Sequence, residues 1–348
     1  MALLDRPLSR EELKKVIEGN GAARRIPLMI HEWVNPDSFN DQALEYKTVL
    51  DQYPNDVVRV YLNMPTFFDA PVDDPSYRWL NYDNPLPPGT AALDANIALD
   101  NWAKLDAVLA DFPNPNYQGL IPKNPLPENG IYRMGLWWGW LFERFWGFRG
   151  MENALCDFYE NGDNVHHLFR AMTDFYKAAV TRGRKELGLD AILTSDDIGM
   201  QTSPFFSIEI FREFFKPYYK ELIDHVHNLG MHFWLHSCGN IKPFIPELIE
   251  IGLDVLHPIQ KYTMDEKEIA VKFGGDICIW GGMDVQRTIP YGSPEDVRRE
   301  VRFMFDTYFR KEGRFMLTAG NVMTADTPLE SLKALLDEAL NYGTKICG

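Results

Sequence analysis

The sequence predicts a single (β/α)8 barrel, an α/β fold in which eight parallel strands alternate with helices. Eight short apolar stretches have the length and the branched or aromatic residues of buried strands, and each except the second is closely followed by a helical pattern. Polar residues also gather directly after these strands, whose carboxyl ends share one mouth in such a barrel. A doubly wound open sheet is the alternative, but no Gly-rich phosphate turn follows the first strand.

The individual elements follow from periodicity and from signals at their ends. Strands are predicted at 24–30, 57–62, 131–138, 191–195, 231–236, 255–259, 277–280 and 315–318. Helices are predicted at 9–19, 41–53, 90–109, 150–160, 164–187, 207–229, 241–252, 265–273, 293–311 and 328–342, with an aromatic loop before the fourth. Ser9 and Glu12 form a capping box that begins the first helix, and Pro294 and Glu295 stand in the first turn of another.

Residues 63–130 interrupt this alternation within the predicted barrel, which spans 1–348. They are rich in Pro, Asn and Asp and contain one predicted helix. An insertion of this length after the second strand suits a lid or a docking segment, although a plain structural excursion is equally compatible with it.

Composition narrows the class of function. Of the 348 residues, 45% are hydrophobic and 24% charged, as in a globular protein, and the net charge is −15. This charge argues against nucleic acid and anionic membranes as partners and makes a strongly anionic substrate unfavourable. Four cysteines without framework spacing suggest a reducing cytoplasm, and no apolar stretch is long enough to cross a bilayer. The first residues also lack the apolar core of a signal peptide.

His236 and Cys238 follow the buried strand at 231–236 and are the first candidates for chemistry. Because residues two apart on an extended chain share a face, the imidazole and the thiol are expected to converge. Nitrogen and sulfur ligands suit zinc above other metal ions. A buried histidine beside a buried structural cysteine is the alternative.

Other polar residues also stand at strand ends, where catalytic groups of a barrel are expected. They are His31, Glu32, Asp196, Asp197, His257, Asp284 and Asn321. Asp196 and Asp197 point to opposite faces, so only one of them readily faces the mouth, and either could instead cap the next segment. Asp284 could equally fix its own loop through hydrogen bonds to the backbone.

Three of these strand ends resemble the uroporphyrinogen decarboxylase superfamily, and more specifically its corrinoid-dependent methyltransferase branch. They are Leu-His-Ser-Cys-Gly-Asn-Ile at 235–241, Asp-Asp-Ile-Gly at 196–199 and Gly-Gly-Met-Asp at 281–284. The resemblance is good over residues 130–345 and weak before them. It implies a (β/α)8 barrel, a catalytic zinc held by His236 and Cys238, and a partner protein that carries a corrinoid (cobalamin).

The sequence departs from this branch at the third zinc ligand. Coenzyme M-type methyltransferases supply a second cysteine after the last strand, where this chain has Gly320-Asn321. Carboxylate oxygens can complete a zinc site, and the nearest candidates are Glu32 and Asp197, with His31 and Asp196 behind them. True uroporphyrinogen decarboxylases place an arginine-bearing loop after the first strand. In this chain, the residues that follow the first strand include Trp33 and Val34 instead.

The resemblance and the residues together favour transfer of a methyl group from a small substrate, expected to be an aryl methyl ether, to the cobalt of the corrinoid. Zinc on His236 and Cys238 would polarise the ether oxygen, and Asp197 or Glu32 would complete the site or deliver a proton. The expected substrate contacts are Trp33, Trp138, His257, Asp284 and Asn321. The alternatives are methyl transfer from a corrinoid to a thiol, a decarboxylase-like lyase and a non-catalytic binding barrel. The sequence indicates no oligomeric state.

Overall fold

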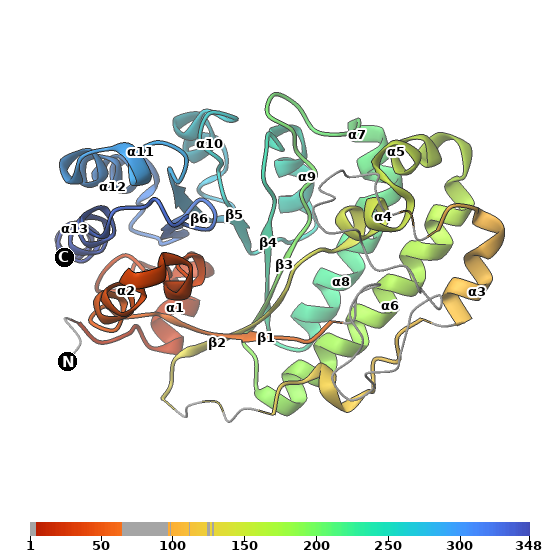
Figure 1. The fold of residues 1–348 in the computed structure, drawn as a ribbon, viewed down its shortest axis with the longest axis horizontal. Helices are drawn as coiled ribbons and strands as arrows, with labels where there is room; N and C mark the ends of the chain where they lie inside the picture. The colour runs from red at the N-terminus through yellow and green to blue at the C-terminus, as the bar shows by residue number, and fades with distance from the viewer. Residues whose placement is uncertain (1–4, 65–96, 98, 111, 124–125, 127–128) are drawn as a thin grey trace.

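The fold is built on a parallel β-sheet whose seven described strands follow one another in chain order (Figure 1). The computed structural model describes residues 5–64, 97, 99–110, 112–123, 126 and 129–348. The strands are β1 (Val57–Tyr61), β2 (Tyr132–Trp137), β3 (Ala191–Ser195), β4 (His232–His236), β5 (Val255–His257), β6 (Cys278–Met283) and β7 (Phe315–Ala319). Every neighbouring pair is parallel, so all carboxyl ends lie at one end of the sheet.

Residues 26–30 close the curled sheet between β7 and β1. Leu28 forms a parallel bridge with Leu317, whose N–H donates to the carbonyl of Pro27 at 2.9 Å, and Asp56 N donates to Leu28 O at 3.2 Å. The strand predicted at 24–30 is therefore reduced to a bridge. Leu28 N donates to the Asp56 carboxylate (2.7 Å) instead of a strand carbonyl, and Pro27 has no N–H to donate. With this segment in the place of the first strand, the predicted (β/α)8 class is confirmed.

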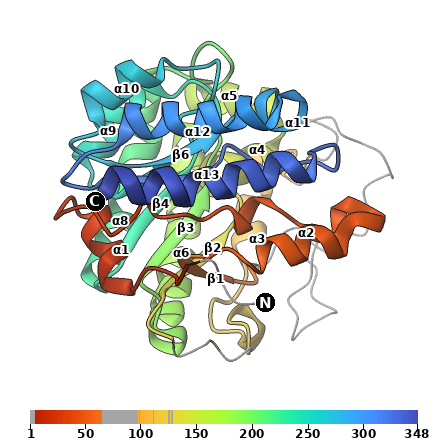
Figure 2. The same ribbon diagram turned by 90° about the vertical axis from the view of Figure 1, so that its left-hand side faces the viewer.

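Helices cover the outside of the sheet (Figures 1 and 2). They are α1 (Arg10–Ile17), α2 (Ala43–Leu50), α3 (Leu105–Ala110), α4 (Leu141–Arg149), α5 (Met151–Glu160), α6 (Gly162–Leu187), α7 (Ile208–Ile210), α8 (Lys216–Asn228), α9 (Ile245–Glu250), α10 (Glu266–Phe273), α11 (Thr288–Tyr291), α12 (Pro294–Tyr308) and α13 (Leu329–Cys347). Helices α6 and α8 pack side by side, as do α12 and α13. The predicted capping box of Ser9 and Glu12 begins α1, and a second one begins α12.

Two stretches differ from the predicted helices. The aromatic loop expected before residue 150 is helix α4, because the Asp196 carboxylate accepts hydrogen bonds from its first-turn amides at Phe142 and Glu143. The helix expected over 207–229 is divided into α7, a π-helical turn at Phe211–Phe215 and α8. Pro217, near the start of α8, has no N–H to donate to the preceding turn, so the helical hydrogen bonding is interrupted there. Residues 90–96 and 98 of the helix predicted at 90–109 lie outside the described residues, and a 3-10 turn at Trp102–Lys104 followed by α3 accounts for its end.

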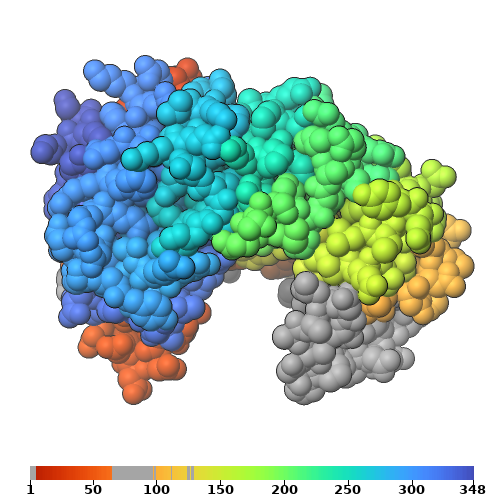
Figure 3. All heavy atoms as spheres, turned by 90° about the horizontal axis from the view of Figure 1, so that it is seen from above, coloured from red at the N-terminus to blue at the C-terminus, as the bar shows by residue number. Residues whose placement is uncertain are grey.

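The interior of the barrel is apolar and closely packed. Every residue of β3, β6 and β7 is buried, and Trp234 and Trp280 meet edge to face with ring centroids 5.4 Å apart. Seen from above, the blue C-terminal elements and the yellow-green α4–α6 region flank the cyan and green segments between them (Figure 3). None of the helices in the described part of the chain has the length and apolar character needed to cross a membrane.

Candidate metal centre and its cavity

The ends of β3 and β4 bring together Asp197, His236 and Cys238. Ser195 and His236 are register partners on the two strands, so Asp197 and Cys238 leave the sheet at the same level. Cys238 Sγ lies 3.4 Å from His236 Nε2, which lies 3.7 Å from Asp197 Oδ1. One ligand atom from each residue falls within 4.8 Å of the others. The predicted convergence of the imidazole and the thiol is present, with a carboxylate as the third group.

Two glycines allow the loops after β3 and β4 to approach this closely. Gly239 has a φ of +84°, in the left-handed region that favours glycine. A Cβ at Gly239 would meet the backbone of Gly199 at 2.3 Å, and a Cβ at Gly199 would meet the carbonyl of Cys238 at 2.7 Å. This backbone contact also lets Cys238 N donate to Asp197 Oδ1 at 2.7 Å, which fixes the carboxylate beside the thiol.

A chain of hydrogen bonds fixes the protonation of His236. His257 Nε2 lies 2.9 Å from Ala319 O, which can only accept, so this nitrogen carries a proton. Burial lowers the pKa of His257 well below its ordinary value, and the neighbouring His236 adds to this shift, so the ring is neutral and its Nδ1 is an acceptor. His236 Nδ1, 2.7 Å away, therefore donates to it. The Nε2 lone pair of His236 is left facing Cys238 and Asp197.

The three groups fit a zinc ion. Ligand atoms of a tetrahedral zinc lie about 3.3–3.6 Å apart, because Zn–N and Zn–S bonds are about 2.0 and 2.3 Å long. The two distances from His236 Nε2 are close to this range. Burial raises the pKa of the Cys238 thiol to about 12, so a cation is needed to hold it as thiolate. A histidine, a cysteine and a carboxylate leave a fourth position for a reactant, as catalytic zinc sites do.

A cavity of about 320 Å³ opens beside these groups. It is lined by Glu32, Trp33, Tyr61, Trp138, Glu143, Ser195, Asp197, His236, Asn321 and Val322. Trp33 stacks on His257 (4.7 Å, 14°) and lies 5.7 Å from Trp138, so the indoles form one aromatic wall. The Nδ2 of Asn321 lies 3.6 Å from Cys238 Sγ. Trp33, Trp138 and Asn321, predicted as substrate contacts, therefore all face this space.

Glu32 also reaches the cavity, but both of its carboxylate oxygens are engaged. Arg59 Nη1 donates to Oε2 and the Tyr61 hydroxyl donates to Oε1, each at 2.7 Å. Of the two carboxylates considered as a third ligand, Asp197 is therefore the one that lies with His236 and Cys238.

Four predicted site residues point elsewhere. His31 Nε2 bonds the carbonyl of Leu50 at the end of α2, because the short 3-10 turn of residues 31–33 directs it away from the mouth. Asp196 caps α4 and accepts a hydrogen bond from Tyr219 at 2.5 Å, so Asp197 is the member of the pair that faces the mouth. His257 is fully buried behind His236 rather than against the cavity.

Asp284 is the fourth: it lines a smaller pocket with Cys238 and Asn321, but its carboxylate is engaged by its own loop. Its carboxylate accepts hydrogen bonds from the amides of Gln286, Arg287 and Thr288 and from the hydroxyl of Tyr262. These bonds fix the loop after β6, in agreement with the structural alternative considered for this residue.

Sequence reasoning missed Glu143 and its partner Ser195. The Ser195 hydroxyl donates to Glu143 Oε2 at 2.5 Å, and both residues line the cavity. Burial, reinforced by Asp197 and Asp196, raises the pKa of Glu143 to about 8. The available signal was a lone carboxylate in the aromatic stretch 136–148, where an apolar environment is expected.

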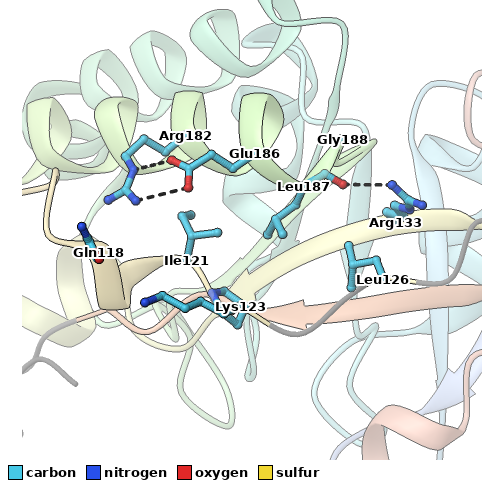
Figure 4. A pocket seen from close by; sticks show the side chains of 10 residues that line it. Gln118, Ile121, Lys123, Leu126, Arg133, Arg182, Glu186, Leu187 and Gly188 are labelled. Carbon is cyan, nitrogen blue, oxygen red and sulfur yellow. Dashed lines mark hydrogen bonds and ion pairs between the residues drawn. The ribbon is translucent and has the colours of Figure 1, made fainter. Parts of the chain in front are cut away.

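A larger cavity of about 640 Å³ lies apart from these residues, between β2 and α6 (Figure 4). Its arginines are already engaged: Arg182 pairs with Glu186, and Arg133 donates to the carbonyl of Leu187. It contains none of the predicted site residues.

Comparison with known proteins finds methyltransferases among the relatives of this chain. It is 24% identical over 241 residues to methylated-thiol–coenzyme M methyltransferase of Methanosarcina mazei, covering 68% of this chain and 58% of the relative. It is 25% identical over 175 residues to methylcobamide:CoM methyltransferase of the same organism, covering 49% of each chain. The chain thus spans about half the length of the curated relatives it matches.

A solved structure shares the fold, and a family model matches more than half of the chain. A methyltransferase from Methanosarcina mazei superposes with a TM-score of 0.59 at 14% identity, covering 96% of this chain and 98% of that one, which supports the fold. The model of the uroporphyrinogen decarboxylase (URO-D) family matches residues 146–342, more than half of the chain, including His236 and Cys238. The chain therefore belongs to the uroporphyrinogen decarboxylase family.

Proposed function

We propose that the protein is a corrinoid-dependent methyltransferase that removes a methyl group from an aryl methyl ether and passes it to the cobalt of a corrinoid held by a partner protein. The observation that carries this proposal is the convergence of His236 Nε2, Cys238 Sγ and Asp197 Oδ1 beside a cavity with an aromatic wall. The matched relatives, whose names describe methyl transfer involving methylcobamide or methylated thiols, support this class of reaction.

The residues divide the work as follows. His236, Cys238 and Asp197 would hold zinc, which when bound supplies a Lewis acid for the oxygen that loses the methyl group. Trp33 and Trp138 pack against the substrate ring, where an aromatic pair contributes about 0.5–1.5 kcal/mol beyond area burial. Glu143, held by Ser195, hydrogen-bonds the departing oxygen. The carbon–oxygen bond breaks, the methyl group goes to the cobalt nucleophile, and the oxygen keeps the electron pair and takes the proton of the Glu143 carboxyl, whose pKa is raised to about 8.

Zinc content is the first test. Protein purified without added metal is expected to contain close to one zinc per chain, and Cys238→Ala is expected to lose it. Cys156→Ala is the matched control, because Cys156 is exposed and far along the chain from the candidate ligands, so this variant should retain zinc. Equal zinc in the two variants, or none in the wild type, refutes the metal centre and favours a non-catalytic binding barrel.

Transfer of methyl from the corrinoid to a thiol is the second candidate, because the matched relatives carry coenzyme M in their names. The two directions are separated by incubating the protein either with a methoxyarene and cob(I)alamin or with methylcobalamin and a thiol. We expect methylcobalamin to form in the first mixture and to persist in the second. The cytoplasmic location, the single domain and a lid or docking role for residues 63–130 belong to the same proposal. Of this segment, residues 65–96, 98, 111, 124, 125, 127 and 128 lie outside the described residues.

A further inference from the structure

The cavity beside the metal centre is lined by acids and rings, and no lysine or arginine of the described residues lines it. Among the described residues that line it, Glu32, Glu143 and Asp197 carry carboxyl groups, and none is a lysine or an arginine. The aromatic wall of Trp33 and Trp138 completes the surface offered to a substrate ring. The cavity therefore offers an anionic substituent no lysine or arginine among the described residues, and the Nε2 of His236 faces Cys238 and Asp197 instead.

The two arginines closest in sequence to the lining residues are hydrogen-bonded to other groups of the protein. Arg59 donates to both the carboxylate and the main-chain carbonyl of Glu32. Arg144 donates to the carbonyls of Gly139 and Trp138, at 3.3 and 2.9 Å, and thus braces the turn that carries the indole. Neither guanidinium lines the cavity, so turning one toward a ligand requires breaking these bonds.

A bound zinc ion would not reverse this polarity. Two charges on the ion are balanced by the Cys238 thiolate and the Asp197 carboxylate, so the centre offers little net attraction to a second anionic group. An anion placed here gives up its hydration without a free cationic partner, because Arg59 is already paired with Glu32, and this disfavours binding. A neutral ring loses little hydration and gains the aromatic wall.

From this lining we propose that the cavity selects uncharged methoxyarenes and rejects those that carry a carboxylate or sulfonate. The inference rests on the proposed function, since it specifies the methyl donor of that reaction. A volume of about 320 Å³ is at the lower end of ligand cavities, which suits a single aromatic ring.

Binding of two matched ligands tests the proposal without relying on turnover. Titration calorimetry on the zinc-loaded protein compares p-methoxybenzyl alcohol with p-methoxybenzoate, which differ in charge on the same ring. We expect the neutral ligand to bind at least about tenfold more tightly. Equal or tighter binding of the benzoate, or no binding of either ligand by protein that contains zinc, overturns the inference.

A variant at the rim makes the charge argument specific. Val322 lines the cavity and is 51% exposed, so a longer side chain is accommodated there. Val322→Lys should raise affinity for the benzoate about tenfold over Val322→Met, while the neutral ligand binds both variants alike. Identical benzoate affinities in the two variants contradict the inference. Methyl transfer from the neutral ligand to cob(I)alamin is measured separately, so loss of the proposed function is distinguished from loss of charge selection.

Discussion

Replacing His257 tests the hydrogen-bond chain that leaves the Nε2 lone pair of His236 free. His257→Leu removes the acceptor 2.7 Å from His236 Nδ1 and the donor to Ala319 O. His257→Asn is nearly the same size as the leucine variant but keeps an acceptor oxygen near the position of the lost Nδ1. Both variants lose the stacking on Trp33, so the difference between them reports the acceptor alone.

The magnitude follows from the burial of the pair. His236 and His257 are 4% and 0% exposed, so water cannot replace the lost acceptor. Removing a group that orients a metal-ligating histidine typically weakens metal binding by about 10–100-fold. That factor corresponds to about 1.4–2.8 kcal/mol and agrees with the cost of leaving one buried polar group without a partner, about 1–3 kcal/mol.

Zinc affinity is measured by competition with a chromophoric chelator at neutral pH, on protein whose folding is checked by circular dichroism. The leucine variant is expected to bind zinc about 10–100-fold more weakly than the wild type, with the asparagine variant clearly closer to it. Equal affinity of the two folded variants would show that the acceptor at His236 Nδ1 is irrelevant. Wild-type affinity in both would show that His257 does not support a metal ligand at all.

Three further predictions concern the metal ligand, the backbone contact and a surface ion pair. Asp197→Asn should reduce zinc per chain while leaving the melting temperature of the metal-free protein nearly unchanged, because the amide oxygen can still accept from Cys238 N; full retention of zinc would exclude this carboxylate as a ligand. Gly239→Ala should lower the free energy of unfolding by at least about 1–3 kcal/mol, because φ is +84° and the new Cβ meets Gly199; an unchanged denaturation midpoint contradicts this. The hydrogen bond to Asp254 (2.8 Å) raises the pKa of His227 against the effect of burial. Its contribution is therefore complete below the ordinary pKa of about 6.5 and is lost as pH rises through the folded value. His227→Gln should lower the melting temperature below pH 6 and have less effect near pH 9. The loss in free energy of unfolding at the lower pH should be less than about 1 kcal/mol, because the pair is partly exposed. A difference that does not change with pH refutes the linkage.

The barrel could be predicted from the sequence because its signals are local. Each buried strand is a short apolar stretch, and its partner helix carries its own periodicity, as α6 and α12 do. What was missed depends on contacts distant in sequence. The first strand is reduced to a bridge because Asp56 takes the N–H of Leu28, and α4 begins where it does because Asp196 caps it from 54 residues away. No window of sequence contains such pairs.

In the candidate site too, the part that depends on local geometry could be predicted and the part that depends on distant contacts could not. His236 and Cys238 are two residues apart where one strand ends, so their convergence follows from extended-chain geometry alone. The choice of Asp197 over Glu32, and the position of His257 behind His236 rather than in front of it, depend on side-chain partners from other strands. Glu143 was overlooked because helix α4, which brings it to the cavity, was itself expected to be a loop.

The replacement of the family's second cysteine by Asn321 is consistent with a working metal centre. A carboxylate carries the same single negative charge as a thiolate, so Asp197 preserves the charge of the ligand set while exchanging a soft atom for a hard one. Asn321 still faces Cys238, with its amide nitrogen 3.6 Å from the sulfur, and this hydrogen bond opposes the effect of burial on the thiol pKa. The position that supplies a ligand in related enzymes would thus act here on the remaining sulfur. This harder ligand set would make a bound zinc a stronger Lewis acid, which the proposed activation of an ether oxygen requires. Activation of a thiol would be served as well by two cysteines.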